Sequence, residues 1–163
     1  MLFFTQIAVA WQKFHITYGG GTGYPYLQAV ATSGEELYSQ YASEVVLSKE
    51  EVLNKLKENH PGVLIDFEQD NWVEINEYTE GGRIKTITFG NISISGVEAR
   101  KIFGLKSANF KVEKDGENIK FSVIGYGHGV GMSQTGADAL AKEGKNYEDI
   151  IHHFYFDVDI TDY

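Results

Sequence analysis

The chain has 163 residues, with 14 basic and 23 acidic side chains, a formal net charge of −9 and no cysteine. This length suits one domain, and 42% hydrophobic residues are enough to form a core. The lack of cysteine excludes disulfides, thiol catalysis and thiolate metal sites, and an acidic chain without a basic stripe argues against nucleic acid as a partner.

The N-terminal segment is apolar but short. Residues 1–10 hold no charged side chain, and the first basic residue is Lys13. A signal peptide has a basic start, and a membrane span needs about 20 apolar residues. We therefore expect no membrane span, and instead a strand over Ile7–Ile16 that leads into the glycine-rich turn Gly19–Gly23.

Helix and strand signals follow in the middle of the chain. Ser48 and Glu51 form a capping box, which predicts a helix that ends at Asn59–Gly62. Turn sequences then separate four short predicted strands, which we expect to form an antiparallel meander. The strands are Val63–Phe67, Trp72–Tyr78, Arg83–Phe89 and Asn91–Ile94.

A second capping box, at Ser95 and Glu98, predicts a short helix that runs through Phe103 and closes at Gly104. A hairpin around Asp115-Gly116 is predicted next, from Phe110–Val112 and Lys120–Ile124. Both features depend on a few neighbouring residues.

Two helices are predicted after residue 131. The first ends at Gly144 and the second is capped by Asn146. A last strand is expected near Val158–Ile160. The predicted class is α+β, with a mainly antiparallel sheet and several short helices. We expect Trp72, Phe110, Phe121 and Phe154 to be core residues.

The strongest signal in the sequence is the segment Gly125–Gln134, with glycine at every second position from 125 to 131. Glycines at this spacing weaken a strand but let a ligand approach the backbone closely. His128 lies between two of them, so its ring has few local neighbours. Ser133 and Gln134 follow at a predicted helix start, where unpaired N–H groups gather. A purely structural turn is the alternative.

Residues Gly127–Gln134 and the positions after them resemble the C-terminal signature of the stage II sporulation protein D family. The later matching positions are Gly136-Ala137, Ala141, Gly144, Tyr147, Ile150, His153 and Tyr155, and similar upstream runs include Gly81-Arg83-Ile84 and Gly104–Phe110. The resemblance implies a single domain over residues 1–163, shortened at its N-terminus, that matches weakly over 1–58 and well over 59–163.

The resemblance implies that the protein handles peptidoglycan. The family is one of lytic transglycosylases, which cleave denuded glycan and leave an anhydro-muramic acid end, and one carboxylic acid protonates the leaving oxygen. In the family that acid lies upstream of a segment that Phe14–Gly20 echoes weakly. No Asp or Glu precedes His15, so the catalytic residue is unknown and enzyme activity stays open. Candidates by residue type alone are Glu35, Glu36, Glu44, Asp138 and Glu143.

The expected role of the glycine-rich segment is to bind sugar. Tyrosine rings stack on pyranose faces, and polar side chains bond hydroxyl and acetamide groups; Trp11, Tyr18, Tyr24 and Tyr126 are stacking candidates. The expected substrate-binding residues are His15, Tyr126, Gly127, His128, Gly129, Gly131, Met132, Ser133 and Gln134.

We expect no cofactor and no metal. A metal site built from His15, His128, His152 and His153 is the alternative, but adjacent histidines on a helix diverge by about 100°. The resemblance implies glycan strands as the partner, together with a cell-wall amidase or endopeptidase, and a place outside the cytoplasmic membrane. The alternatives are a non-catalytic module that docks a cell-wall hydrolase, and a degenerate chain without a function of its own.

Overall fold

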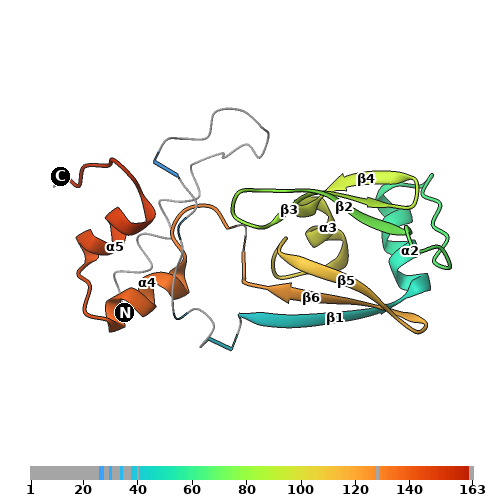
Figure 1. The fold of residues 1–163 in the computed structure, drawn as a ribbon, viewed down its shortest axis with the longest axis horizontal. Helices are drawn as coiled ribbons and strands as arrows, with labels where there is room; N and C mark the ends of the chain where they lie inside the picture. Colours follow the sequence, from blue (N-terminus) through green and yellow to red (C-terminus); the bar gives the residue numbers. More distant parts are fainter. Residues whose placement is uncertain are drawn as a thin grey trace.

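The structure is a computed structural model that describes residues 26, 27, 30, 34, 38, 39, 41–127 and 129–161. The predicted strand Ile7–Ile16 and the turn after it lie outside these residues. The α+β class is confirmed, because the described part holds six strands and four helices. Figure 1 shows the strands with α2 and α3 on one side of the molecule and α4 with α5 on the other.

The strands form two antiparallel sheets instead of one. β1 (Ala42–Ser48), β6 (Asn118–Ile124) and β5 (Phe110–Asp115) make the first sheet, in the order β1–β6–β5. The second has the order β2–β3–β4 and confirms three of the four strands of the predicted meander. Its strands are β2 (Val73–Tyr78), β3 (Ile84–Phe89) and β4 (Ile92–Ser95).

The first two helices begin where the sequence predicts. α2 (Lys49–Asn59) has the complete capping box of Ser48 and Glu51. α3 (Gly96–Phe103) begins at Ser95, whose hydroxyl accepts the N–H of Glu98 at 3.1 Å. The predicted second half of that box is not seen, because the Glu98 carboxylate bonds His60 Nε2 at 2.9 Å instead.

The last two helices, α4 (Gln134–Lys142) and α5 (Tyr147–Phe154), pack against each other. The Ser133 hydroxyl caps α4, and Asn146 caps α5 as predicted. These helices have their own small apolar cluster, formed by Ala137, Ile150 and Phe154 with Met132, Leu140, Tyr155 and Val30 around it. None of the described helices is long and apolar enough to cross a membrane.

Two strand predictions were wrong, and one strand was missed. Val63–Phe67 and Val158–Ile160 are not strands, and β1 was not predicted. The backbone of Leu64 bonds Asn91 in the β3–β4 turn, through its N–H to Asn91 Oδ1 at 2.7 Å and its carbonyl to the Asn91 N–H at 3.3 Å. The segment is therefore held by a turn, and no strand ladder includes it.

The main core lies between the two sheets, where a run of aromatic rings connects them. Phe103 of α3 lies with its ring centroid 5.4 Å from that of Phe89 on β3 and 4.7 Å from that of Phe121 on β6. The expected core residues Trp72, Phe110, Phe121 and Phe154 are all buried, which confirms that prediction. Helix α3 thus joins both sheets to one apolar cluster.

Candidate functional site

The glycine-rich segment leaves β6 and runs to the start of α4. Its four glycines, Gly125, Gly127, Gly129 and Gly131, all have positive φ, between 70° and 95°. Residues with a Cβ rarely adopt this conformation, so the alternation of glycine with larger residues has a backbone cause. The segment is an irregular loop and does not continue strand β6.

Three segments that are far apart in the sequence meet at this connection. The N–H of Gly127 donates to the carbonyl of Lys106 at 2.8 Å, and an isolated parallel bridge joins Gly127 to the fully buried Ser107. The N–H of Ile84, at the start of β3, donates to the carbonyl of Ala108 at 2.9 Å. The runs around residues 81–84, 105–110 and 125–127 therefore share one hydrogen-bonded junction.

The side chain of Arg83 lies directly against Gly129. A Cβ built on Gly129 would be 1.7 Å from Arg83 Cζ and 2.1 Å from Arg83 Nε. The guanidinium thus fills the space that any side chain at 129 would need. This contact ties the β2–β3 hairpin to the middle of the glycine-rich segment.

The far end of the segment is fixed by α4 and α5. The Ser133 hydroxyl accepts the N–H of Gly136 at 3.1 Å, and the N–H of Met132 donates to the hydroxyl of Tyr155 at 3.2 Å. The ring of Tyr155 packs on that of Tyr26, with centroids 6.4 Å apart. Burial raises the pKa of the Tyr155 hydroxyl, so this group is protonated at neutral pH.

The predicted binding residues have different surroundings in the structure. Tyr126 is 67% exposed, and Gln134 is exposed at the first turn of α4. Ser133 caps a helix and Met132 packs in the α4–α5 cluster, so both have structural contacts as well. His128 and His15 lie outside the described residues, as do the stacking candidates Trp11, Tyr18 and Tyr24.

Asp138 has the wrong electrostatics for a general acid. Its carboxylate accepts a hydrogen bond from Lys142 Nζ at 2.8 Å and another from the hydroxyl of Tyr38. First Lys142 and then Tyr38 lower the pKa of this carboxyl. A general acid needs a raised pKa, so that it still holds its proton near neutral pH.

We expect the pKa of Asp138, followed by carboxyl NMR, to lie below that of an unfolded-chain aspartate. A group with a lowered folded pKa stabilises the fold above its unfolded pKa, and this contribution disappears as the pH falls through the folded pKa. The contact between α4 and Tyr38 should therefore persist at neutral pH and weaken only in acid. Lys142→Gln should raise the pKa more than Tyr38→Phe; a titration above the ordinary aspartate range would contradict this.

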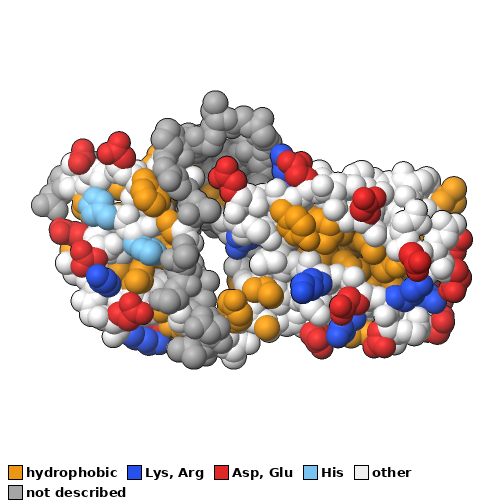
Figure 2. Space-filling view, viewed as in Figure 1, with side chains coloured by type: hydrophobic (Ala, Val, Ile, Leu, Met, Phe, Trp, Pro, Cys, Tyr) orange, Lys and Arg blue, Asp and Glu red, His pale blue; other side chains and the backbone are white. Residues whose placement is uncertain are grey.

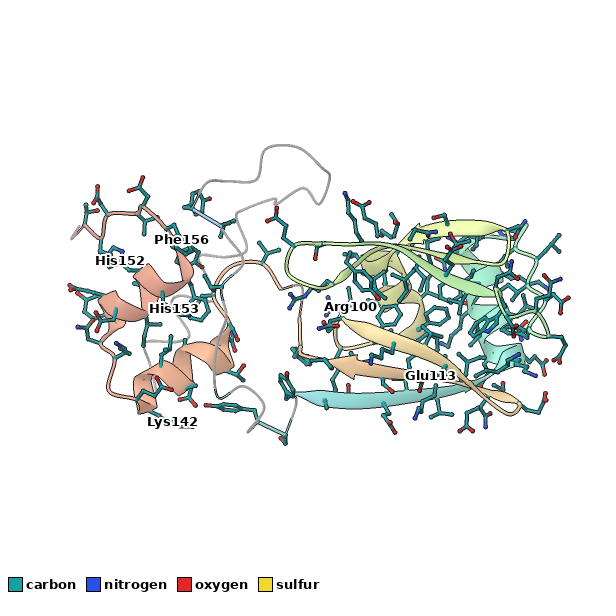
Figure 3. The ribbon with its side chains drawn as sticks, viewed as in Figure 1. Arg100, Glu113, Lys142, His152, His153 and Phe156 are labelled. Atoms are coloured by element: carbon teal, nitrogen blue, oxygen red, sulfur yellow. The ribbon has the colours of Figure 1, made fainter. Side chains whose placement is uncertain are left out.

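Three other predicted catalytic or metal candidates among the described residues, Glu143, His152 and His153, lie at the end of α4 and on α5. Glu143 is exposed at the opposite end of α4 from Ser133, and nine helical residues span about 13 Å. On α5, His152 is exposed, whereas the half-buried ring of His153 packs edge-on against Phe154 (Figure 3). Within the described ranges, no group of three or more His, Asp or Glu side chains is placed to hold a metal ion.

Comparisons with known proteins give the family of the chain. No protein-family model matches the chain. Over 138 residues, or 85% of the chain, it is 33% identical to a protein of Bacillus amyloliquefaciens and 32% identical to one of Bacillus subtilis, both named stage II sporulation protein D. The chain belongs to the stage II sporulation protein D family. It spans 38% of the length of each of these relatives.

A second kind of relative covers less of the chain. The chain is 40% identical to a Bacillus subtilis protein named amidase enhancer over 75 residues, which are 44% of the chain. The match covers 11% of the length of that relative. The two relatives named stage II sporulation protein D confirm the family resemblance that the sequence indicated.

Sequence reasoning gave no role to Arg83, although it lies in one of the runs that resemble stage II sporulation protein D. What singles Arg83 out is the contact of its side chain with Gly129, which exists only in the folded chain. Tyr155 was likewise noted only as a matching position, and its bond to Met132 was not foreseen.

Proposed function

We propose that this chain takes part in cell-wall remodelling during sporulation by binding peptidoglycan glycan strands along the segment Gly125–Gln134. The observation that carries this proposal is the junction at which residues 81–84, 105–110 and 125–134 meet. These are the runs that resemble the family, and the relatives' names point to sporulation and to an amidase. A role in the cell wall implies a location outside the cytoplasmic membrane.

The surface of the segment suits a sugar polymer. Tyr126 is mostly exposed beside glycines that leave the backbone open, and an exposed aromatic ring can stack on a pyranose face. Gln134 adds an exposed amide, which can both donate to and accept from sugar hydroxyls. The fixed backbone around them means that little conformational entropy is lost on binding.

The test is to incubate the chain with amidase-treated peptidoglycan, then to follow both its retention on the insoluble glycan and the soluble products by mass spectrometry. We expect retention, and we expect Tyr126→Ala to reduce it about tenfold, in line with the roughly 1–2 kcal/mol of an aromatic contact. Ile124→Ala, an apolar truncation on the exposed face of β6, is the matched control and should bind like the unaltered chain.

The products separate a binding protein from an enzyme. Release of anhydro-muramic acid ends would show that the chain holds a catalytic carboxylate of its own, as in a lytic transglycosylase. Retention without release would show binding alone. A chain that is neither retained nor active would refute the glycan proposal.

A second candidate function is favoured by the relative named amidase enhancer. In this alternative the chain docks a cell-wall amidase and does not itself cleave glycan. The rate at which an amidase releases stem peptides from insoluble peptidoglycan should then rise when the chain is added. An unchanged rate, together with no complex in analytical ultracentrifugation, would refute this alternative.

A further inference from the structure

Strand β1 forms an open edge of the β1–β6–β5 sheet. Among the described strands it pairs with β6 alone, over all 7 of its residues and without a register shift. Figure 1 shows β1 along the lower border of the strand-rich part, with no other described strand or helix below it. Its outer side therefore carries a row of backbone donors and acceptors that no described strand pairs.

The hydrogen bonds at the two ends of β1 show which residues face this edge. The N–H of Gly125 donates to the carbonyl of Tyr41 at 2.6 Å, and at the other end the N–H of Lys49 bonds the β5–β6 turn at 3.0 Å. Antiparallel strands exchange such bonds at every second residue, so the odd-numbered residues of β1 bond β6. The even-numbered residues, among them Glu44 and Val46, direct their N–H and C=O groups away from β6. Both side chains are exposed, that of Val46 by 51%.

Strand β1 lacks the features that keep sheet edges from pairing with other chains. Natural edges are protected by charged side chains, proline, bulges or short length. The strands at the other edges have such features: β5 (FKVEKD) is rich in charge, β2 has register shifts, and β4 has only 4 residues. In contrast, β1 (ASEVVLS) has a single charged residue, no proline and a regular register.

We propose that β1 pairs antiparallel with β1 of a second copy of this chain, which joins the two three-stranded sheets across a two-fold axis. Because even-numbered residues face the edge, Glu44 can lie opposite Glu44, Val46 or Ser48 of the second copy. The first register opposes two carboxylates. The third needs the N–H of Ser48, which already donates to the Glu51 carboxylate at 2.8 Å. The register with Glu44 opposite Val46 remains, and it alone overlaps the whole strand.

This register suits both faces of β1. The outward N–H and C=O groups of Glu44 and Val46 bond each other across the axis, with two hydrogen bonds at each of the two equivalent pairs. On the opposite face, Val45 lies at the axis and meets Val45 of the second copy. Val45 is half-buried at the rim of the main core, so the pairing removes apolar surface from water as well as satisfying backbone groups.

Net charge is the main factor that opposes this association. Each copy carries a formal charge of −9, so two copies repel each other at low salt, whereas the screening length is about 8 Å at 0.15 M salt. On the face in Figure 2, basic and acidic side chains are mixed over the strands, so the negative charge is not gathered there. A single strand pair is a small interface, and we expect a dissociation constant on the order of 100 μM at 0.15 M salt.

The dimer would carry two glycine-rich segments. Each segment begins at Gly125, whose N–H bonds Tyr41 directly before β1. Antiparallel pairing therefore places the two segments at opposite ends of the joined sheets. This inference does not depend on what the segments bind, but any polymeric ligand could be bound at two sites by one dimer.

Sedimentation equilibrium of the unaltered chain, at concentrations up to about 1 mM, tests the association. We expect a reversible monomer–dimer equilibrium. Hydrogen exchange followed by NMR then locates the interface. The amides of Glu44 and Val46 should become more protected as the concentration rises, whereas the amide of Val45, which bonds β6, should be protected at every concentration.

Charges at position 46 test the register. Val46→Lys faces Glu44 of the second copy and should tighten the dimer about fivefold, whereas Val46→Glu opposes like charges and should weaken it by about the same factor. Tyr78→Lys and Tyr78→Glu make the same changes of net charge at a residue of β2 that is 56% exposed. These controls should change the dissociation constant by less than about twofold, because their charges are remote and screened.

Val46→Pro tests the backbone pairing. Proline removes the N–H that faces the second copy and leaves the bonds between β1 and β6, so the dimer should be lost while the monomer stays folded. Urea unfolding of every variant at a concentration below the dissociation constant checks that the monomer is intact. If Val46→Pro unfolds the monomer, the two charge variants still decide.

Four results would overturn the inference. A chain that stays monomeric at about 1 mM does not pair. Weakening by Val46→Lys as well as by Val46→Glu would refute the pairing of Glu44 with Val46. Equal effects of the Tyr78 variants would assign the association to net charge alone. Protection of the Glu44 and Val46 amides only after a cell-wall amidase is added would assign the edge to another protein. Retention on glycan is measured separately, so this inference and the proposed function can fail independently.

Discussion

Phe121→Ala should lower the free energy of unfolding by about 3–5 kcal/mol, the range for a buried phenylalanine truncated to alanine. The side chain is 0% exposed, on the central strand of the β1–β6–β5 sheet. Its ring centroid lies 4.7 Å from that of Phe103 and 6.0 Å from that of Phe110. The substitution removes these contacts and leaves a cavity between α3 and the sheet that rigid neighbours cannot fill.

Urea unfolding of the two proteins measures this difference, with the slope m as a check that both unfold in the same way. Ile124→Ala is the matched control, because it shortens an apolar side chain on the same strand that is 41% exposed. That change should cost less than about 1 kcal/mol. Equal costs for the two variants would mean that Phe121 is not packed as the structure shows.

The features predicted correctly from the sequence are those whose causes are local. Ser48 and Asn146 cap helices through residues only three positions away, and Gly104 closes α3 through its own positive φ. The β2–β3–β4 meander follows from its turn sequences in the same way. Such interactions need no knowledge of distant segments.

The wrong strand predictions depended on distant segments. Val63–Phe67 has the composition of a strand, but Asn91 captures the backbone of Leu64. β1 was missed in the sequence. It pairs with β6 along its whole length, and in the folded chain its residues largely alternate between exposed and half-buried. A sheet is specified by its partner strands, which periodicity within one segment does not reveal.

The same limit applies to the candidate site. The spacing of glycine predicted a weakened strand at 125–131, and the structure shows that all four glycines there have positive φ. Which side chain fills the space beside them was not predictable, because Arg83 comes from another element and touches Gly129 only in the folded chain. Composition revealed the segment, whereas the positive charge of Arg83 beside it became visible only in three dimensions.

Gly90→Ala is the second substitution with a large expected effect, about 2–5 kcal/mol of lost stability. Gly90 forms the β3–β4 turn with a φ of 54°, and its N–H donates to the carbonyl of Trp72 at 2.9 Å. A Cβ there would lie 1.9 Å from the carbonyl oxygen of Leu64, which is backbone and cannot rotate away. The left-handed conformation costs about 1–2 kcal/mol and overpacking about 1–3 kcal/mol more.

Gly82→Ala separates these two costs. Gly82 lies in the β2–β3 turn with a φ of 71° and has no neighbour within 4 Å of a built Cβ. Both substitutions restrict the unfolded chain equally, so that contribution cancels in the comparison. Urea unfolding should therefore give about 1–2 kcal/mol for Gly82→Ala from strain alone. The additional loss of stability in Gly90→Ala, relative to Gly82→Ala, measures the clash with the Leu64 carbonyl. Equal losses would mean that the Leu64 backbone moves away freely, which would contradict its two hydrogen bonds to Asn91.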